Sequence, residues 1–346
     1  MASEPTIKFA TPLAQSTRSE ILTWAFPPPF QNYILTGRSR AAWHTSFIIP
    51  QLNLLLDAGL CVNKVRPKHI FLTHGHSDHT LLAPAFGNRD DPPDVWCPVE
   101  MAGAFEAFCH ARTRLNQGGV EKGGEGSGDE GSGEEDGEDG NGSGKEKGKK
   151  GGGKKGKENG NETRNPLDRH VVHPVQPGDI VTLPRAKGIT ALAFKCDHTV
   201  PCIGYVFRQT TKKLKPEFSA LSGQELRQLR EKEGVEITKE VTTPIFAFLG
   251  DTTAATLASE PEWLKEGIPV VITECSFLYE SHHAQADKTK HTAWVDLERV
   301  VRKWPKTTFL LTHFSMRYTD GEIRKFFKGL VDPPANVVIW ADGEDS

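Results

Sequence analysis

A cluster of histidines constrains this chain more than any other feature of its sequence. The segment Ile70–His79 reads IFLTHGHSDH, a short apolar stretch followed by three imidazoles and one carboxylate within six residues. A chance H-x-H-x-D-H pattern is expected in roughly one in a thousand chains of this length and composition. The pattern therefore predicts a metal site at the end of a strand, and disfavours a set of unrelated surface histidines.

The spacing within this segment suits two divalent ions. His74 and His76 are separated by one residue on an extended turn, so that both side chains point toward one ion. Asp78 and His79 lie where the chain turns into the next helix, and they suit a second ion. Imidazole and carboxylate ligands without a thiolate favour Zn²⁺, with Mn²⁺ or Fe²⁺ as alternatives.

Apolar strand-like segments alternate with helical patterns along much of the chain. Strands are predicted over residues 46–50, 52–57, 69–73, 95–98, 171–175, 180–183, 189–195, 204–209, 244–249, 269–273, 307–312 and 337–340. Helices are predicted over residues 101–115, 223–232, 292–304 and 320–328. Blocks of strands with helices between them predict two packed sheets covered by helices.

Glycine is concentrated in one segment. Residues 117–163 hold 18 of the 33 glycines, together with 12 acidic residues and 8 lysines, and they contain almost no aliphatic and no aromatic side chains. Such a segment cannot bury enough apolar surface to offset the entropy of ordering it. We therefore expect a disordered surface insertion, and the alternative that its lysine run binds RNA stays open. The remaining chain is near neutral, which neither indicates nor excludes a nucleic-acid partner.

Membrane and secreted classes are disfavoured. The chain has no apolar run of about 18 residues, and its first 20 residues lack a basic start followed by an apolar core. Its six cysteines are scattered without a C-x-x-C pair, which predicts small buried side chains in a reducing, intracellular compartment. We expect the cytoplasm or the nucleus, and an organelle stays open.

Several motifs together resemble the metallo-β-lactamase superfamily, and within it the tRNase Z enzymes, particularly the plant short form. After its first motif the superfamily has a histidine following a strand, an aspartate in a Gly-Asp loop and a late histidine. The segments FKCDHTV, FAFLGDTT and FLLTHFSMRY supply His198, Asp251 and His313 in that order. The text HFSMRYT and the stretch Lys213–Pro244 resemble the tRNase Z branch, and the resemblance runs from about Ser39 to Tyr318.

This resemblance implies an α/β fold, a four-layer αββα sandwich with a two-metal site at the sheet edge. It implies a single catalytic domain over residues 37–346, interrupted by the insertion at 117–163 and preceded by a partly ordered N-terminal extension, residues 1–36. Ligands come from both sides of the insertion, so the insertion is not expected to separate two domains.

The resemblance also implies a ligand set for two Zn²⁺ ions per chain, with Mn²⁺ as an alternative. His74, His76 and His198 hold one ion, Asp78, His79 and His313 hold the other, and Asp251 bridges them. Two ions at such a site share a hydroxide that attacks a phosphodiester, and Asp78 counts among the catalytic residues.

A proton-transfer pair is implied as well. Glu274 in ECSF and His291 in HTAW fall where the family has its glutamate and histidine, with His291 protonating the leaving 3′-oxygen and Glu274 orienting the imidazole. Purely structural roles, a salt-bridge acid and a helix-capping histidine, are the alternatives for these two residues.

The implied substrate is precursor tRNA, whose 3′ trailer the enzyme removes. Lys212, Lys213 and Lys215 are candidate tRNA contacts, Arg317 and Tyr318 are candidates near the phosphate, and a homodimer is expected from the family. Two departures stand out. Thr80–Pro84 replaces the Gly-rich segment that usually follows the first motif, and residues 208–243 stand in place of the long RNA-clamping arm of bacterial members.

Three other interpretations stay open. The first is another hydrolase of the superfamily, acting on a different phosphodiester, a thioester or a lactam. The second is a catalytically weak RNA-binding member, and the third is a structural zinc protein without hydrolytic activity. The Glu274–His291 pair and the text HFSMRY argue against the first, and the complete ligand set argues against the second. The third stays open, because a catalytic site differs from a structural one by an open coordination position, which a sequence does not show.

Overall fold

The computed structural model describes residues 7–14, 20–60, 66–87, 91–116, 118–119 and 171–343. Apart from Gly118 and Gly119, the predicted insertion at 117–163 lies outside the described residues, as does Cys61.

The first half of the fold is a run of hydrogen-bonded strands in the order β8-β7-β6-β5-β4-β3-β2-β1. Its strands are β1 (Lys8–Pro12), β2 (Leu22–Ala25), β3 (Ile34–Arg40), β4 (His44–Ile49), β5 (Leu54–Leu56), β6 (His69–Phe71), β7 (Asp94–Pro98) and β8 (Val171–Val175). Strands β1 to β5 pair antiparallel, and β5 to β8 pair parallel. Parallel pairing places the carboxyl ends of β5, β6 and β7 at one edge, where loops can carry functional side chains.

The second half continues from β1 in the order β15-β14-β13-β12-β11-β10-β9. Its strands are β9 (Ile180–Thr182), β10 (Ile189–Cys196), β11 (Cys202–Leu214), β12 (Thr238–Phe248), β13 (Val270–Glu274), β14 (Thr308–Thr312) and β15 (Val337–Asp342). Strands β12 to β15 pair parallel, and β1 pairs parallel with β15. Strand β1 therefore joins the two half-sheets into one continuous hydrogen-bonded ladder.

The two half-sheets pack face to face over a shared aromatic core. Phe47 of β4 meets Trp340 of β15 at 5.1 Å between ring centroids, and Phe71 of β6 meets Tyr205 of β11 at 4.8 Å. Both rings in each pair are buried, as the alternation of strand side chains between two faces predicts. Burial of large aromatic side chains on both inner faces makes this contact a main source of stability.

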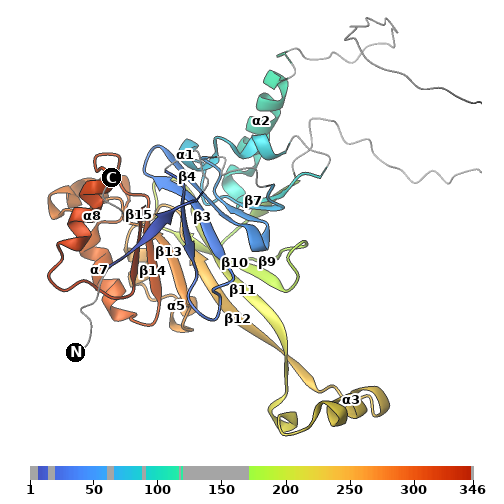
Figure 1. Cartoon of the computed structure of the whole chain (residues 1–346). Helices are drawn as coiled ribbons and strands as arrows, with labels where there is room; N and C mark the ends of the chain where they lie inside the picture. The colour runs from blue at the N-terminus through green and yellow to red at the C-terminus, as the bar shows by residue number, and fades with distance from the viewer. Residues whose placement is uncertain are drawn as a thin grey trace, which may run out of the picture.

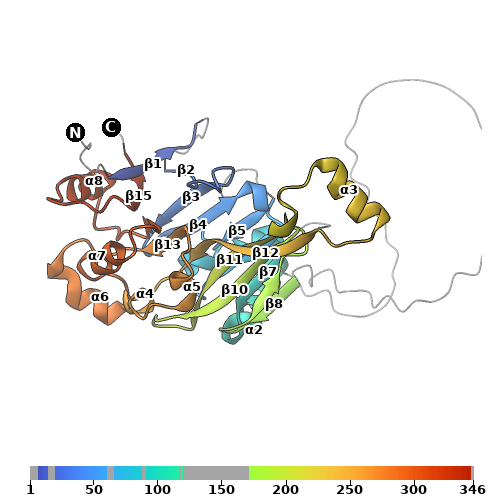
Figure 2. The same ribbon diagram turned by 90° about the horizontal axis from the view of Figure 1, so that it is seen from below.

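Helices cover the two outer faces (Figures 1 and 2). On one side lies α2 (Val99–Asn116), whose buried Phe105 packs in a core with Ile70 and Val95 of the first half-sheet. On the other side the helices bury a core that includes Leu297 and Phe327 against the second half-sheet. These helices are α4 (Ala255–Ala258), α5 (Glu262–Lys265), α6 (His283–Thr289), α7 (Trp294–Lys303) and α8 (Asp320–Lys328). The predicted four-layer αββα sandwich is confirmed.

A two-stranded arm projects from the body (Figures 1 and 2). It consists of the outer halves of β11 and β12 together with α3 (Gly223–Lys232). Ser222 and Glu225 form a capping box at the N-terminus of α3. No residue of α3 is buried. The sequence predicted this helix with the same bounds, but it predicted only residues 204–209 and 244–249 of the much longer strands.

Three strands were not predicted, and all lie near the N-terminus. β1 and β2 fall in the segment 1–36, and β3 carries a glycine and two arginines, a composition that rarely indicates a buried strand. Arg38 and Arg40 are nevertheless buried, because both guanidinium groups donate to the Asp320 carboxylate at the start of α8. A long-range ion pair, which a local pattern does not reveal, makes this strand possible.

Candidate metal centre

Loops at the carboxyl ends of strands from both half-sheets converge on one site. The turn after β6 carries His74 and His76 and leads into α1 (Ser77–Thr80). In the second half-sheet, His198 follows β10, Asp251 follows β12 and His313 follows β14. The seven ligands proposed from the sequence therefore lie in one place, although 239 positions separate the first from the last in the numbering of the chain.

One group of side chains surrounds a first candidate metal position. His76 Nδ1 lies 3.0 Å from His74 Nε2 and 3.3 Å from His198 Nε2. Asp251 Oδ2 lies 3.7 Å from His74 Nε2 and 3.8 Å from His198 Nε2. A tetrahedron with bonds of about 2.0–2.1 Å has edges of about 3.3 Å, so this donor set fits a tetrahedral ion such as zinc.

A second group lies on the other side of Asp251. Asp78 Oδ2 is 3.5 Å from the Nε2 atoms of both His79 and His313, and those two nitrogens are 3.4 Å apart. Asp251 Oδ1 is 3.4 Å from each of the same two nitrogens. The two oxygens of the Asp251 carboxylate thus face different groups, which is the arrangement that a bridging ligand requires.

Burial and charge prepare these groups for binding a cation. Burial lowers the pKa values of His74, His76 and His198, which favours the neutral imidazole that ligates metals. Burial by itself raises the pKa of Asp251, but His313 and His79 outweigh it and hold this pKa well below its usual range. The carboxylate is therefore ionised, as a metal ligand must be.

Outer partners fix the orientation of several imidazoles. His79 Nδ1 lies 2.7 Å from Asp57 Oδ2, and His198 Nδ1 donates to the Lys290 carbonyl oxygen at 3.0 Å. His313 Nδ1 lies 3.1 Å from Ser276 Oγ. Such partners select the tautomer of a ligating histidine and hold its ring in place.

Asp57 is a site residue that the sequence analysis did not single out. Its carboxylate is fully buried, and it also accepts hydrogen bonds from the backbone and the hydroxyl of Thr73. The sequence does show that Asp57 directly follows the apolar strand LLL, just as Asp251 directly follows FAFLG. One aspartate after a strand is too common a pattern to identify a function by itself.

Glu274 and His291 form a pair at the edge of the two groups. His291 Nδ1 lies 2.8 Å from Glu274 Oε1 and 3.9 Å from Asp251 Oδ2. Burial alone lowers the pKa of His291, but the Glu274 carboxylate outweighs it and raises this pKa to about 9. The pair therefore favours a protonated imidazole beside the metal ligands.

Glu274 itself is not arranged as a free ligand, although it lies within ligand distance of Asp251, His291 and His313. Its two oxygens accept hydrogen bonds from the backbone amides of Thr252 and Thr292, and from the hydroxyl of Ser276. His291 is the fourth partner of this carboxylate. Both Glu274 oxygens are therefore engaged in hydrogen bonds with the surrounding loops.

The proposed RNA contacts lie in two different places. Lys212 and Lys213 are exposed on the outer half of β11 and Lys215 is half-buried beyond it, all on the arm. Arg317 is exposed near His313, with its guanidinium 5.1 Å from the Phe277 ring centre. Tyr318 is buried, and its hydroxyl lies 2.6 Å from His282 Nδ1, so this side chain packs under the loop instead of facing outward.

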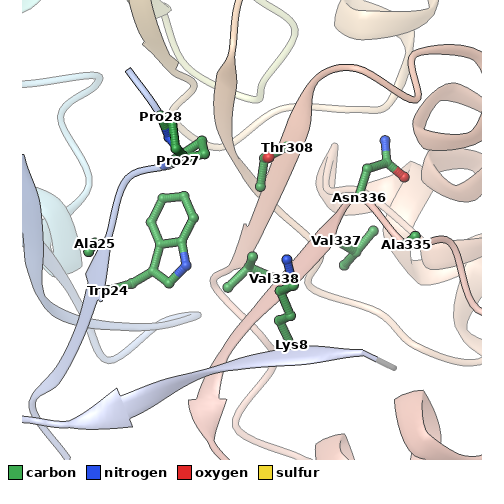
Figure 3. A pocket seen from close by; sticks show the side chains of 10 residues that line it. All are labelled: Lys8, Trp24, Ala25, Pro27, Pro28, Thr308, Ala335, Asn336, Val337 and Val338. Atoms are coloured by element: carbon green, nitrogen blue, oxygen red, sulfur yellow. The ribbon is translucent and has the colours of Figure 1, made fainter. Parts of the chain in front are cut away.

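A separate cavity lies at the opposite end of the parallel strands (Figure 3). It has a volume of about 220 Å³ and is lined by Trp24, Thr308, Asn336 and their neighbours. Thr308 begins β14, whereas His313 follows its end. The cavity therefore has no part in the metal-ligand groups.

The family model described as the Metallo-beta-lactamase superfamily matches residues 60–180. The matched segment is similar to a metallo-beta-lactamase domain. The match confirms the superfamily resemblance drawn from the histidine motif, and the sandwich fold agrees with it.

Relatives in plants are similar over most of the chain. The Arabidopsis thaliana protein named tRNase Z TRZ2, chloroplastic, is 27% identical over 85% of this chain and 71% of its own length. The Arabidopsis thaliana protein named tRNase Z TRZ1 is 25% identical over 88% of this chain and 92% of its own length. The crystal structure of the short form of human tRNase Z covers 89% of this chain and 95% of its own, with 13% identity and a TM-score of 0.47.

No helix among the described ranges is long and apolar enough to cross a membrane. Five cysteines, Cys97, Cys109, Cys196, Cys202 and Cys275, are buried free thiols, as expected of small packing residues.

Proposed function

We propose that this protein is a metal-dependent endoribonuclease that removes the 3′ trailer of precursor tRNA. The observation that carries the proposal is the Asp251 carboxylate, which presents one oxygen to each of two His/Asp groups beside the Glu274–His291 pair. Relatives named tRNase Z support the choice of substrate. A pair of metal positions of this kind suits the in-line displacement of a phosphodiester oxygen.

Zinc fits the donor set best, with manganese as the alternative. His74, His76 and His198 would hold one ion, Asp78, His79 and His313 the other, and Asp251 would bridge. The residues are imidazoles and carboxylates, with spacings near those of a tetrahedral zinc site. Ions held there would activate water and stabilise the negative charge that develops on the phosphate.

His291 is the proton donor in this proposal. The leaving 3′-oxygen of the ribose needs a proton, and the pKa of about 9 keeps His291 charged at neutral pH. Glu274 holds the imidazole through Nδ1, which directs its other nitrogen away from this carboxylate. The backbone amides bonded to Glu274 keep that orientation fixed without help from substrate.

The substrate would extend beyond the metal positions. We assign electrostatic contacts with tRNA to Lys212, Lys213 and Lys215 on the arm, and a phosphate contact to Arg317 near His313. Tyr318 supports the loop that carries Arg317. A homodimer and an intracellular location remain predictions, the latter supported by the buried free thiols and by relatives named as chloroplastic and nuclear.

The test is cleavage of a 3′-extended precursor tRNA by the purified protein loaded with Zn²⁺ or Mn²⁺. We expect a cut next to the discriminator base, and loss of the reaction after chelation with restoration by added metal. Hydrolysis of a lactam, a thioester or a small phosphodiester without cleavage of the precursor would favour another hydrolase of the superfamily. Precursor binding without any hydrolysis would favour a catalytically weak RNA-binding member.

A further inference from the structure

Trp43 lies beside the metal-ligand groups without belonging to them. The residue is 53% exposed, while the other six tryptophans of the chain are buried or half-buried. Single exposed apolar residues are common and carry no meaning by themselves. The position of Trp43 and the hydrogen bonds of the turn that carries it are what distinguish it.

The turn that carries Trp43 is bonded to both loops of the second ligand group. The Ala42 amide donates to Asp78 Oδ2 at 3.1 Å, and the Ala41 amide donates to the carbonyl oxygen of Phe314, which follows His313. Ala42 adopts a left-handed φ of 59°, and the Trp43 amide closes the turn by donating to the carbonyl oxygen of Arg40. Since one peptide unit separates the Ala42 nitrogen from the next Cα, the Trp43 Cα lies within about 8 Å of Asp78 Oδ2.

The ring of Trp43 packs against His44, and much of the residue is exposed to solvent. Its centroid lies 4.3 Å from that of His44, at an interplanar angle of 53°. Two further exposed apolar side chains, Leu81 and Met316, follow His79 and His313 by two and three residues. The loops of the second ligand group therefore carry exposed apolar side chains as well as the exposed Arg317.

We propose that Trp43 is a stacking platform for a nucleobase of single-stranded RNA next to the scissile phosphate. The inference rests on the proposed function, because that function places an unpaired RNA segment at the metal-ligand groups. A tryptophan ring offers a large flat surface on which any base can stack, so it suits a trailer of variable sequence. The hydrogen bonds of the turn hold the backbone of Trp43, and His44 packs against its ring, which reduces the entropy lost on binding.

The test is a fluorescence titration of the zinc-loaded protein with a short oligouridylate and with the same backbone lacking bases. We expect the oligouridylate to quench the emission of the wild-type protein, and Trp43→Phe to bind it while losing most of the quenching. Trp43→Ala should bind the oligouridylate about five- to 150-fold more weakly, which corresponds to the loss of one stacked base. The abasic strand should bind Trp43→Ala and the wild type equally.

Ile180→Ala is the matched control, because Ile180 is 67% exposed on β9 and outside the ligand groups. It should bind both strands like the wild type, and the melting temperatures of all variants should agree. Equal binding of the oligouridylate by Trp43→Ala and the wild type would overturn the inference, as would an equal loss with the abasic strand. If base-dependent quenching persists but precursor tRNA is never cut, the proposed endonuclease fails while the stacking site stands.

Discussion

Strands β11 and β12 pass through two contrasting environments. The first six residues of β11 are all buried, and its last seven are half-buried or exposed. Strand β12 shows the reverse order and ends in four buried residues just before Asp251. The inner halves of these two strands lead to the proposed metal ligands. The outer halves belong to the arm, in which no residue of α3 is buried.

The two halves of this hairpin are therefore expected to have different roles, namely positioning side chains near Asp251 and attracting RNA along the arm. Around Asp251, dense packing and outer hydrogen bonds hold side chains at spacings that a metal ion needs. On the arm, exposed lysines lie on strands that contact little besides each other, and charges in water act mainly through long-range attraction. Changes near the ligands should therefore alter metal content and turnover, and changes on the arm should alter binding and its dependence on salt.

The largest effect is expected from Asp251→Ala. This change removes one ligand oxygen from each group, and it leaves the first group without a carboxylate. We expect the variant to retain little metal after dialysis and to lose about 10⁴-fold or more in precursor cleavage, since the ions contribute several kcal/mol to lowering the barrier. Metal analysis and cleavage rates on the same preparation would check both expectations.

Asp332→Ala provides the control, because Asp332 is a largely exposed partner of Arg302 far outside the ligand groups. It should keep full metal content and activity. If Asp251→Ala still binds two ions with unchanged affinity, the carboxylate does not bridge and the division into two groups is wrong.

A smaller and more selective effect is expected from His291→Ala. The His291 side chain is hydrogen-bonded to Glu274, whereas its Nδ1 lies 3.9 Å from Asp251 Oδ2, too far for a hydrogen bond. The variant should therefore retain both ions. Loss of a general acid should lower kcat by about 10²- to 10⁴-fold with little change in KM. His283→Ala is the control, since His283 on α6 pairs with Asp296 on α7 and should leave both quantities unchanged. A metal-free His291→Ala would show that this residue ligates an ion.

The sequence predicts the strand ends around Asp251 well, whereas it predicts the arm poorly. The proposed ligands His74, His198, Asp251 and His313 each follow an apolar strand, and the carboxyl ends of these strands meet at one edge, so local patterns suffice. Asp57 follows a strand in the same way, but its role depends on His79, which lies 22 residues further along.

The arm and the N-terminal strands are harder to predict, for a physical reason. The outer half of β11 reads QTTKKL, which is polar on both faces, so nothing in its own pattern shows that β12 pairs with it. β1 lies beside β15 at the other end of the chain, and this pairing joins the half-sheets. Contacts between distant segments decide both cases, while hydrophobic periodicity reports only what one segment buries.

The smallest effect is expected from the triple change of Lys212, Lys213 and Lys215 to alanine. Each lysine that neutralises a phosphate releases a counterion, so the slope of the logarithm of affinity against the logarithm of salt should become shallower by about 2. Hydrolysis of a small phosphodiester should not change, because such a substrate does not reach the arm. The same triple change at the exposed residues Lys306, before β14, and Lys325 and Lys328, on α8, is the matched control for net charge. If both triple variants lower the slope equally, tRNA responds to the overall charge of the protein and the arm has no special part in binding.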